Sequence, residues 1–245
     1  MEIEIYQLIL IAVIAFAASY IQSVSGFGFG IFAMIFLPRL LAYTEANMLS
    51  SMLSVLTSVF VVIYTFRKAS YKNIIFPLIG FLFTTYISIM FLKGAGNEIL
   101  TLLLGIALLT LSVYFFFFSD KIRIKSTWYA GLIAGLLSGI LGGMFAMSGP
   151  PVVIYFMQSE EDSEHYLATL SAYFVISGVA SVFIKAGAGF ITPNVWAAFV
   201  IGLGGMLLGA IVGKRTRTHI SSAALKKTVY AIMAISGIIN IITSI

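Results

Sequence analysis

Two interruptions by glycine and proline inside very apolar stretches constrain this chain more than any other feature. Residues 25–30 read SGFGFG within an apolar run over residues 5–38, and residues 146–151 read AMSGPP in the second half. Glycine and proline weaken a helix, and an exposed backbone amide in hydrocarbon persists only where protein or a wet cavity surrounds it. Such interruptions at matching positions of two halves indicate the substrate site of a membrane transporter.

The composition is typical of a membrane protein. Of the 245 residues, 60% are hydrophobic and 9% are charged, whereas charged residues make up about a quarter of a soluble domain. Several apolar runs reach the roughly 20 residues that a helix needs to cross a bilayer. We therefore expect an all-α polytopic membrane protein with a single transmembrane domain over residues 1–245.

The charge and cysteine content exclude other classes of protein. The first basic residue is Arg39, so we expect no cleaved signal peptide, which would begin with positive charge. Cysteine is absent from the sequence, and this excludes disulfides, thiolate metal sites and cysteine nucleophiles. We attribute the formal net charge of +5 to lysines and arginines in loops, and we expect no nucleic-acid partner.

The order of the predicted helices suggests an internal duplication. Helices are expected over residues 5–20, 31–37, 46–66, 74–92, 99–118, 128–157 with its interruption, 166–184, 195–212 and 228–242. Each half contains an interrupted segment, then a helix with small polar residues, then two further helices. We predict two homologous halves, 1–120 and 126–245, in which Ser51 corresponds to Ser171 and Leu56 to Ile176.

The distribution of basic residues indicates the orientation of the halves. Each interrupted segment could enter the membrane and return to the side from which it came. One face of the membrane would then carry only Arg39, Lys93 and Lys185. The opposite face then carries Arg67, Lys68, Lys72, Lys121, Arg123, Lys125, Lys214, Arg215, Arg217, Lys226 and Lys227. The positive-inside rule favours this arrangement over single crossings, which would divide the basic residues evenly. It predicts inverted repeats in the cell membrane, with both termini outside.

The charged residues also limit the substrate. No ionisable side chain is expected deep in a predicted span, whereas cation-coupled carriers usually contain intramembrane carboxylates. The ligand must then bind neutral groups, and backbone amides at helix N-termini attract anions. Ser148 is expected to cap the helix that Pro150 and Pro151 begin.

Candidate substrate-binding residues therefore cluster at the interruptions. The main candidates are Gln22, Ser25, Gly26, Phe27, Gly28, Gly30, Gly143, Ala146, Met147, Ser148, Gly149, Pro150 and Pro151. Second-rank candidates are Ser51, Ser54, Ser171, Tyr173 and Arg39. The alternative role is close helix packing, which is commoner for any single glycine or hydroxyl. No nucleophile–base pair, metal-ligand spacing or phosphate loop is visible, so we expect neither an enzyme nor a metal or cofactor site.

These motifs resemble those of the TauE/SafE family of sulfite- and sulfoacetate-exporter-like membrane transporters. Residues 22–30, followed by Pro38, resemble the glycine-rich first motif of the family, and residues 139–151 are similar to its second motif, which ends in Gly-Pro-Pro. Ala146 and Ser148 stand where glycines are more usual, and Phe29 interrupts a glycine run. The resemblance extends over the whole chain and implies transport of small anions that often contain sulfur.

The leading hypothesis is a secondary transporter of a small anion, with a sulfur oxyanion or a sulfonate such as sulfoacetate as the substrate. The family resemblance points to sulfur, and the amide-rich interruptions point to an anion. An anion channel is the alternative, because it would use the same amides. The expected partners are the small anionic substrate and the lipid bilayer, and a homo-oligomer is left open.

Overall fold

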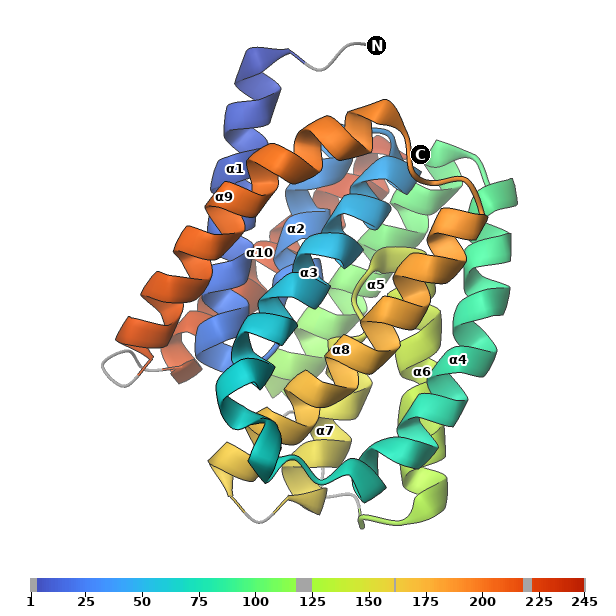
Figure 1. The fold of residues 1–245 in the computed structure, drawn as a ribbon. Coiled ribbons are helices and arrows are strands. Elements are labelled where there is room, and N and C mark those ends of the chain that lie inside the picture. The colour runs from blue at the N-terminus through green and yellow to red at the C-terminus, as the bar shows by residue number, and fades with distance from the viewer. Residues whose placement is uncertain (1–3, 118–124, 161, 218–221, 245) are drawn as a thin grey trace.

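The computed structural model describes residues 4–117, 125–160, 162–217 and 222–244, and helices make up the whole of its regular structure there (Figure 1). The α-helices are α1 Ile5–Ser25, α2 Phe29–Phe36, α3 Tyr43–Thr65, α4 Tyr71–Gly94, α5 Asn97–Phe117, α6 Trp128–Phe145, α7 Gly149–Ser159, α8 Ser163–Gly187, α9 Pro193–Thr216 and α10 Ser222–Thr243. Two 3₁₀ turns, η1 Leu37–Arg39 and η2 Phe66–Lys68, follow α2 and α3. Lys121, Arg123 and Glu161 lie outside the described residues.

Helix lengths confirm the polytopic membrane fold. Within the described part of the chain, 7 helices are long and apolar enough to cross a membrane, and these are α1, α3 with η2, α4, α5, α6, α8 and α9. Shorter apolar helices cover Phe29–Arg39 and Lys227–Thr243. Many large apolar side chains on these helices point outward and are well exposed, for example Phe83 at 67% and Val200 at 65%. Such a surface is suited to lipid and not to water.

Local capping explains where several helices begin. Thr127, Asp162 and Thr192 are the N-caps of α6, α8 and α9, and each side chain accepts a backbone N–H of the first turn. At the other end of α1 the helix continues to Ser25, five residues beyond the predicted end at residue 20. It stops only where Gly26 adopts a left-handed conformation with φ 87°.

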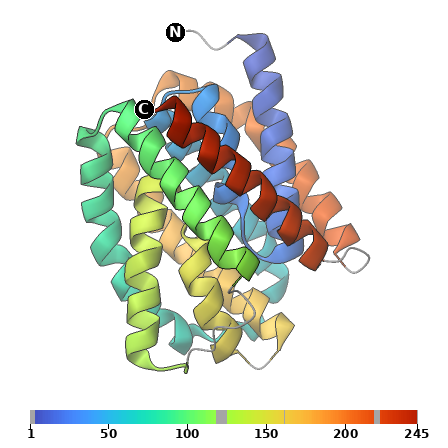
Figure 2. The same ribbon diagram turned by 180° about the vertical axis from the view of Figure 1, so that it is seen from behind.

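Each interrupted segment is a hairpin that returns to the end of the bundle from which it came. The side-chain Nε2 of Gln7, in the first turn of α1, lies 3.5 Å from the Leu40 carbonyl oxygen, just after α2. In the second half, Glu160 at the end of α7 accepts from the Asn73 amide at 2.9 Å. Trp128, at the start of α6, packs against Phe76, which lies in α4 as Asn73 does. Both ends of the second hairpin are therefore next to the beginning of α4. Figures 1 and 2 show that the first hairpin enters from the end with both termini, and the second from the opposite end.

Small residues bring the outer helices close to one another. In α9, Gly205 and Gly209 face backbone carbonyls of Ala12 and Phe16 in α1, with no room for a side chain. The pair α4 and α6 repeats this packing with other glycines, as does the pair α5 and α10. Glycine contacts of this kind allow close van der Waals packing of membrane helices. Helices α3 and α8 pack against each other in the middle of the molecule, between these pairs (Figure 1).

Candidate functional site

The first break, residues 26–28, is built from two glycines with positive φ. Gly26 has φ 87° and donates its N–H to the Gln22 carbonyl at 2.8 Å, which closes the last turn of α1. Gly28 has φ 108° and is the N-cap of α2. Because a side chain is strongly disfavoured at such φ values, the glycines determine where the chain turns. The Ser25 hydroxyl lies 2.7 Å from the Phe27 carbonyl and holds the turn from inside.

The second break, residues 146–148, turns at Ala146. Its φ is 55°, and it is the sole non-glycine residue with positive φ among those described, which accounts for the glycine usual at this position. The amides of Ala146 and Met147 donate to carbonyls of the last turn of α6 at 3.1 Å each. Asn47 of α3 donates to the Met144 carbonyl at 2.8 Å, so α3 satisfies a carbonyl that the helix end leaves free.

The two breaks touch each other near the middle of the molecule. A methyl group built on Gly30 would overlap with the Ala146 carbonyl oxygen, so the backbone of α2 lies directly against the second break. On the other side of this contact, a methyl on Gly149 would lie 3.4 Å from Cβ of Phe27. The tertiary structure therefore brings together two segments that are far apart in the sequence.

A small cavity of about 20 Å³ lies between the breaks. It is lined by Gln22, Gly28, Phe29, Gly30, Ile31, Ser54, Ala146, Met147, Ser148, Gly149 and Phe174. A neighbouring cavity of about 30 Å³ shares four of these residues and is lined by Ser51, Ser54, Val55, Phe81, Gly142, Ala146, Ser148, Phe174, Gly178 and Ser181. Since a water molecule needs roughly 10–15 Å³, each cavity holds little more than water in this closed arrangement.

Several backbone amides at the cavity have no hydrogen-bond acceptor. The first intrahelical bond of α2 is donated by Phe32 to Gly28, which leaves the amides of Phe29, Gly30 and Ile31 unpaired within the described residues. In α7 the second and third residues are prolines, so among its first three residues Gly149 alone has an N–H to offer. The residues with these amides all line the cavity between the breaks.

The expected cap at Ser148 is wrong in one respect. Ser148 is the N-cap of α7, but its side chain makes no capping hydrogen bond. A capping side chain accepts from the second or third residue of the helix, and Pro150 and Pro151 have no N–H there. The Ser148 carbonyl instead accepts from the Ser138 hydroxyl at 2.6 Å, and that hydroxyl is also 2.9 Å from the Tyr173 hydroxyl.

Gln22 lies in the cavity wall and is held by α3. Its Nε2 donates to the Ser58 hydroxyl at 2.7 Å, and its Oε1 accepts from the Ser54 hydroxyl at 3.3 Å. Among the second-rank candidates, Ser51 and Ser54 line the cavities, whereas Tyr173 supports the second break through Ser138. The polar side chains of α3 and α8 thus form the walls around the two breaks.

Other predicted residues lie away from the two cavities. Gly143 packs on α4, where a methyl would meet Ser88 Cβ at 2.6 Å. Gly26 faces Leu167 of α8, and Arg39 is exposed at the end of η1. Ser171 is buried in α8 but does not line either cavity.

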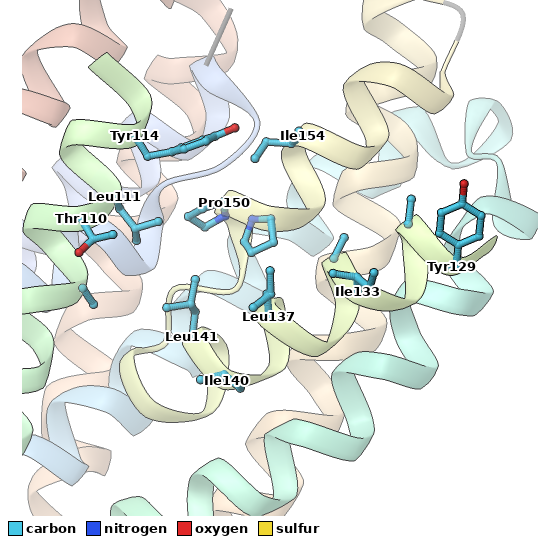
Figure 3. Close-up of a pocket in the computed structure, with 14 residues that line it drawn as sticks. Thr110, Leu111, Tyr114, Tyr129, Ile133, Leu137, Ile140, Leu141, Pro150 and Ile154 are labelled. Carbon is cyan, nitrogen blue, oxygen red and sulfur yellow. The ribbon is translucent and has the colours of Figure 1, made fainter. Parts of the chain in front are cut away.

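Pro150, which is buried, and Pro151 line an apolar groove of about 650 Å³ between α5, α6 and α7 (Figure 3). Leu111, Leu137 and Leu141 line the same groove with other apolar side chains. Exposed apolar side chains surround it, as expected for a surface that lipid covers.

Ser25, Phe27 and Gly28 border another cavity, smaller than the two at the breaks, beside Tyr230 of α10.

Lys185 was missed by the sequence reasoning, which placed it in a loop and expected no deep ionisable side chain. Its side chain is 0% exposed, and its ammonium donates to the Ser51 hydroxyl at 2.7 Å and to the Gly142 carbonyl at 3.1 Å. The expectation failed because α8 extends to Gly187 and turns this side chain inward. A signal was available: Thr169, Tyr173, Ser177, Ser181 and Lys185 recur every fourth residue and form one polar helix face.

Comparison with protein families supplies the identification. The family model described as Sulfite exporter TauE/SafE matches residues 11–239, which includes both breaks and nearly the whole bundle. The chain belongs to the TauE/SafE sulfite exporter family. No curated protein and no solved structure matches the chain. The resemblance seen in the sequence motifs is thereby confirmed.

Membership in the TauE/SafE family and the apolar helices together define the general class of the protein. It is a multi-pass membrane protein of a transporter family, and not of an enzyme family. Its general partners are a small anion and membrane lipid. The family therefore agrees with the anionic substrate that the interruptions predict.

Proposed function

We propose that this TauE/SafE protein is a secondary transporter of a small sulfur oxyanion or sulfonate, with sulfite or sulfoacetate as representative substrates. The anion is bound near the middle of the membrane by backbone amides at the two breaks. One observation carries this proposal: two helix N-termini with unpaired amides line a single buried cavity. Each N-terminus has a partial positive charge, so the pair attracts one anion from both sides.

The closed cavity is consistent with alternating access. At about 20 Å³ it is too small for an oxyanion, so binding requires the two breaks to separate. The breaks belong to hairpins from opposite ends of the bundle (Figures 1 and 2), and rocking of one hairpin against the other would open the cavity to one end at a time. This motion gives saturable exchange and not a continuous pore.

The inverted repeats and the orientation belong to the same proposal. Helix α1 of the first half packs on α9 of the second, and α6 of the second half packs on α4 of the first, as expected if a two-fold axis exchanges the halves. The positive-inside rule then places the α3–α4 connection, with Arg67, Lys68 and Lys72, in the cytoplasm. Both termini face outward across the cell membrane.

Uptake into liposomes tests the proposed function. The purified protein is reconstituted and offered sulfite, thiosulfate, sulfoacetate and taurine, each with and without the same anion inside. We expect saturable uptake of at least one sulfur anion that accelerates when unlabelled anion is present on the opposite side. Unitary currents in a planar bilayer, or uptake that never saturates, would replace the carrier by a channel.

The variant Gly28→Val tests the amide site in the same assay. Valine disfavours the φ of 108° at this position, so the turn that presents the amides is lost. Gly204→Val is the matched control, because Gly204 is a helix residue with open space around it. Gly28→Val should abolish uptake while the protein remains monodisperse, and full uptake by this variant would place the site elsewhere.

A further inference from the structure

The ammonium group of Lys185 is buried without an anionic partner. Within the described residues the ion pairs are Lys68–Glu164 and His165–Asp162, and both lie at the surface. Glu45, the one carboxylate in the α3 sequence, accepts a hydrogen bond from the Thr192 hydroxyl at 2.6 Å. A buried charge is costly unless it is paired, and an intramembrane lysine is kept for function far more often than for stability.

The neighbours of Lys185 satisfy only part of the hydrogen-bonding capacity of its ammonium group. Gly142 lies at the C-terminal end of α6, where carbonyls carry a partial negative charge. The Ser51 hydroxyl accepts a hydrogen bond from Lys185 and donates its own O–H to the Asn47 carbonyl at 2.9 Å. Two neutral acceptors leave one of the three ammonium donors and the full positive charge without a counterpart.

A second polar group beside Lys185 lacks a partner. Ser181 lies one turn before Lys185 on the same face of α8 and is 4% exposed. Its hydroxyl oxygen has no hydrogen-bond partner in the described part of the chain, although it lines the cavity of about 30 Å³. Buried hydroxyls are almost always hydrogen-bonded, so an unpaired one on a cavity wall indicates a ligand.

The two observations meet in one cavity. Ser51 and Gly142, which accept from Lys185, line the same cavity as Ser181. This cavity shares Ala146 and Ser148 with the cavity that the unpaired amides line. Lys185 itself lines neither cavity, but both of its acceptors line the larger one, so these acceptors are what separates its ammonium group from an anion at the breaks.

We propose that Lys185 is the counter-ion of the transported anion and, with Ser181, binds one of its oxygens. This inference rests on the proposed function, since it identifies the charged part of that site. The amides orient the substrate, and the lysine supplies the full charge that amide dipoles lack. It also explains selectivity for anions, because a cation in this cavity would face an unneutralised ammonium.

Anion-induced thermal stabilisation and direct binding by the purified protein test this inference. The variants are Lys185→Met, Lys185→Gln, Lys185→Arg and Ser181→Ala, with Lys93→Gln as the matched control. Lys93 is an exposed lysine in the last turn of α4, at the same end of the bundle (Figure 1). The ligands are sulfite, thiosulfate, sulfate and sulfoacetate, together with nitrate, phosphate and acetate as anions without sulfur.

We expect Lys185→Met and Lys185→Gln to bind the sulfur anion roughly 10- to 100-fold more weakly, because a hydrogen bond to a charged group is lost. Without ligand, Lys185→Met should melt at the same or a higher temperature than the parent, since an apolar residue replaces a buried charge. Lys185→Arg should retain part of the affinity, and Lys93→Gln all of it. If Lys185→Met lowers the melting temperature but binds normally, Lys185 only stabilises the end of α6 and the inference is overturned.

The other outcomes separate this inference from the proposed function. Equal affinity of the parent and the Lys185 variants for a sulfur anion overturns the inference and leaves the transporter proposal intact. Lys185-dependent binding of nitrate, phosphate or acetate alone keeps the lysine site and overturns the sulfur assignment. Failure of the parent to bind any of these anions overturns both. If the Met and Gln variants do not fold, Ser181→Ala decides: it removes an unpaired hydroxyl, so unchanged affinity overturns the inference.

Discussion

At the scale of single residues, Gly30 shows how a missing methyl group allows the two breaks to meet. Alanine is a better helix former than glycine by up to about 1 kcal/mol, so propensity alone would make Gly30→Ala stabilising. The Ala146 carbonyl occupies the place of the new Cβ, however, and the hairpins must move apart to accept it. Packing and propensity therefore have opposite signs at this position.

We predict that Gly30→Ala destabilises the protein by roughly 1–3 kcal/mol, as overpacking does, and reduces uptake. The measurement is thermal unfolding of the purified variant beside liposome uptake. Gly204→Ala is the control, because open space surrounds Gly204 and the same substitution should leave stability equal or higher. A stability gain in both variants would show that the breaks do not make this contact in solution.

Ser148 provides a second prediction at the residue scale. Because its side chain makes no capping bond, Ser148→Ala should change stability by less than about 0.5 kcal/mol. Thr192→Ala is the contrast: the Thr192 hydroxyl accepts from the Val195 amide at 3.3 Å, and loss of such a cap costs roughly 0.5–2 kcal/mol. Chemical or thermal denaturation measures both, and an equal loss in the two variants would contradict the interpretation of α7.

At the scale of elements, the position of proline decides what a helix N-terminus can offer. In α9 proline is the first residue, so the amide of Val195 is free for the Thr192 cap. In α7 the prolines are second and third, which removes the donors that a cap or a ligand would use. The two breaks are consequently unequal: α2 presents more amides to the cavity, and α7 contributes fewer.

The N-terminus of α8 illustrates a charged cap outside the membrane. Hydrogen bonds from the His165 backbone and side chain, and then from the Glu164 amide, lower the pKa of Asp162 from its ordinary 3.8 to about 2. A depressed pKa in the folded state means that this cap stabilises fully above the ordinary pKa. The contribution is lost as the pH falls through the folded value of about 2.

We therefore predict that the melting temperatures of the parent and Asp162→Asn converge as the medium is acidified across this range. Asparagine can still cap the helix but does not titrate, and the difference between the two proteins isolates Asp162 from the other carboxylates. A difference that stays constant from neutral to strongly acid pH would contradict the lowered pKa.

At the scale of the whole molecule, two hairpins from opposite ends meet at their breaks, and α3 and α8 pack beside them (Figure 1). Ser51 and Ser54 of α3 and Ser181 of α8 line the cavity at this contact. The outer pairs, α1 with α9 and α4 with α6, hold each hairpin through close glycine packing. A motion that separates the breaks can therefore carry α9 with one hairpin and α4 with the other.

Single cysteines test the proposed orientation, since the sequence has no cysteine of its own. Lys72 and Ser126 are exposed at one end of the bundle, and Lys93 and Gly187 are exposed at the other. Cysteines at the first two positions should react only from the cytoplasm, and those at the last two only from outside. Labelling of Ser126→Cys and Gly187→Cys from the same side would contradict the inverted arrangement.

The sequence by itself determined the features that depend on local chemistry. Apolar runs of sufficient length predicted the spans, and the glycines and prolines located both breaks, because backbone conformation and helix propensity are properties of neighbouring residues. The motifs at residues 22–30 and 139–151 also led to the family, which the match over residues 11–239 confirms.

Only the tertiary structure decided which residues meet. The contact of Gly30 with Ala146, and the burial of Lys185 beside Ser51 and Gly142, join segments that no spacing rule connects. Lys185 illustrates the reason: a lysine near the end of a span normally extends to the interface, and whether it turns inward depends on acceptors supplied by other helices. The cavity between the breaks is lined by Gly28 but not by Pro150, Gly143 or Arg39. Packing decides this difference, and the chemistry of the individual residues does not.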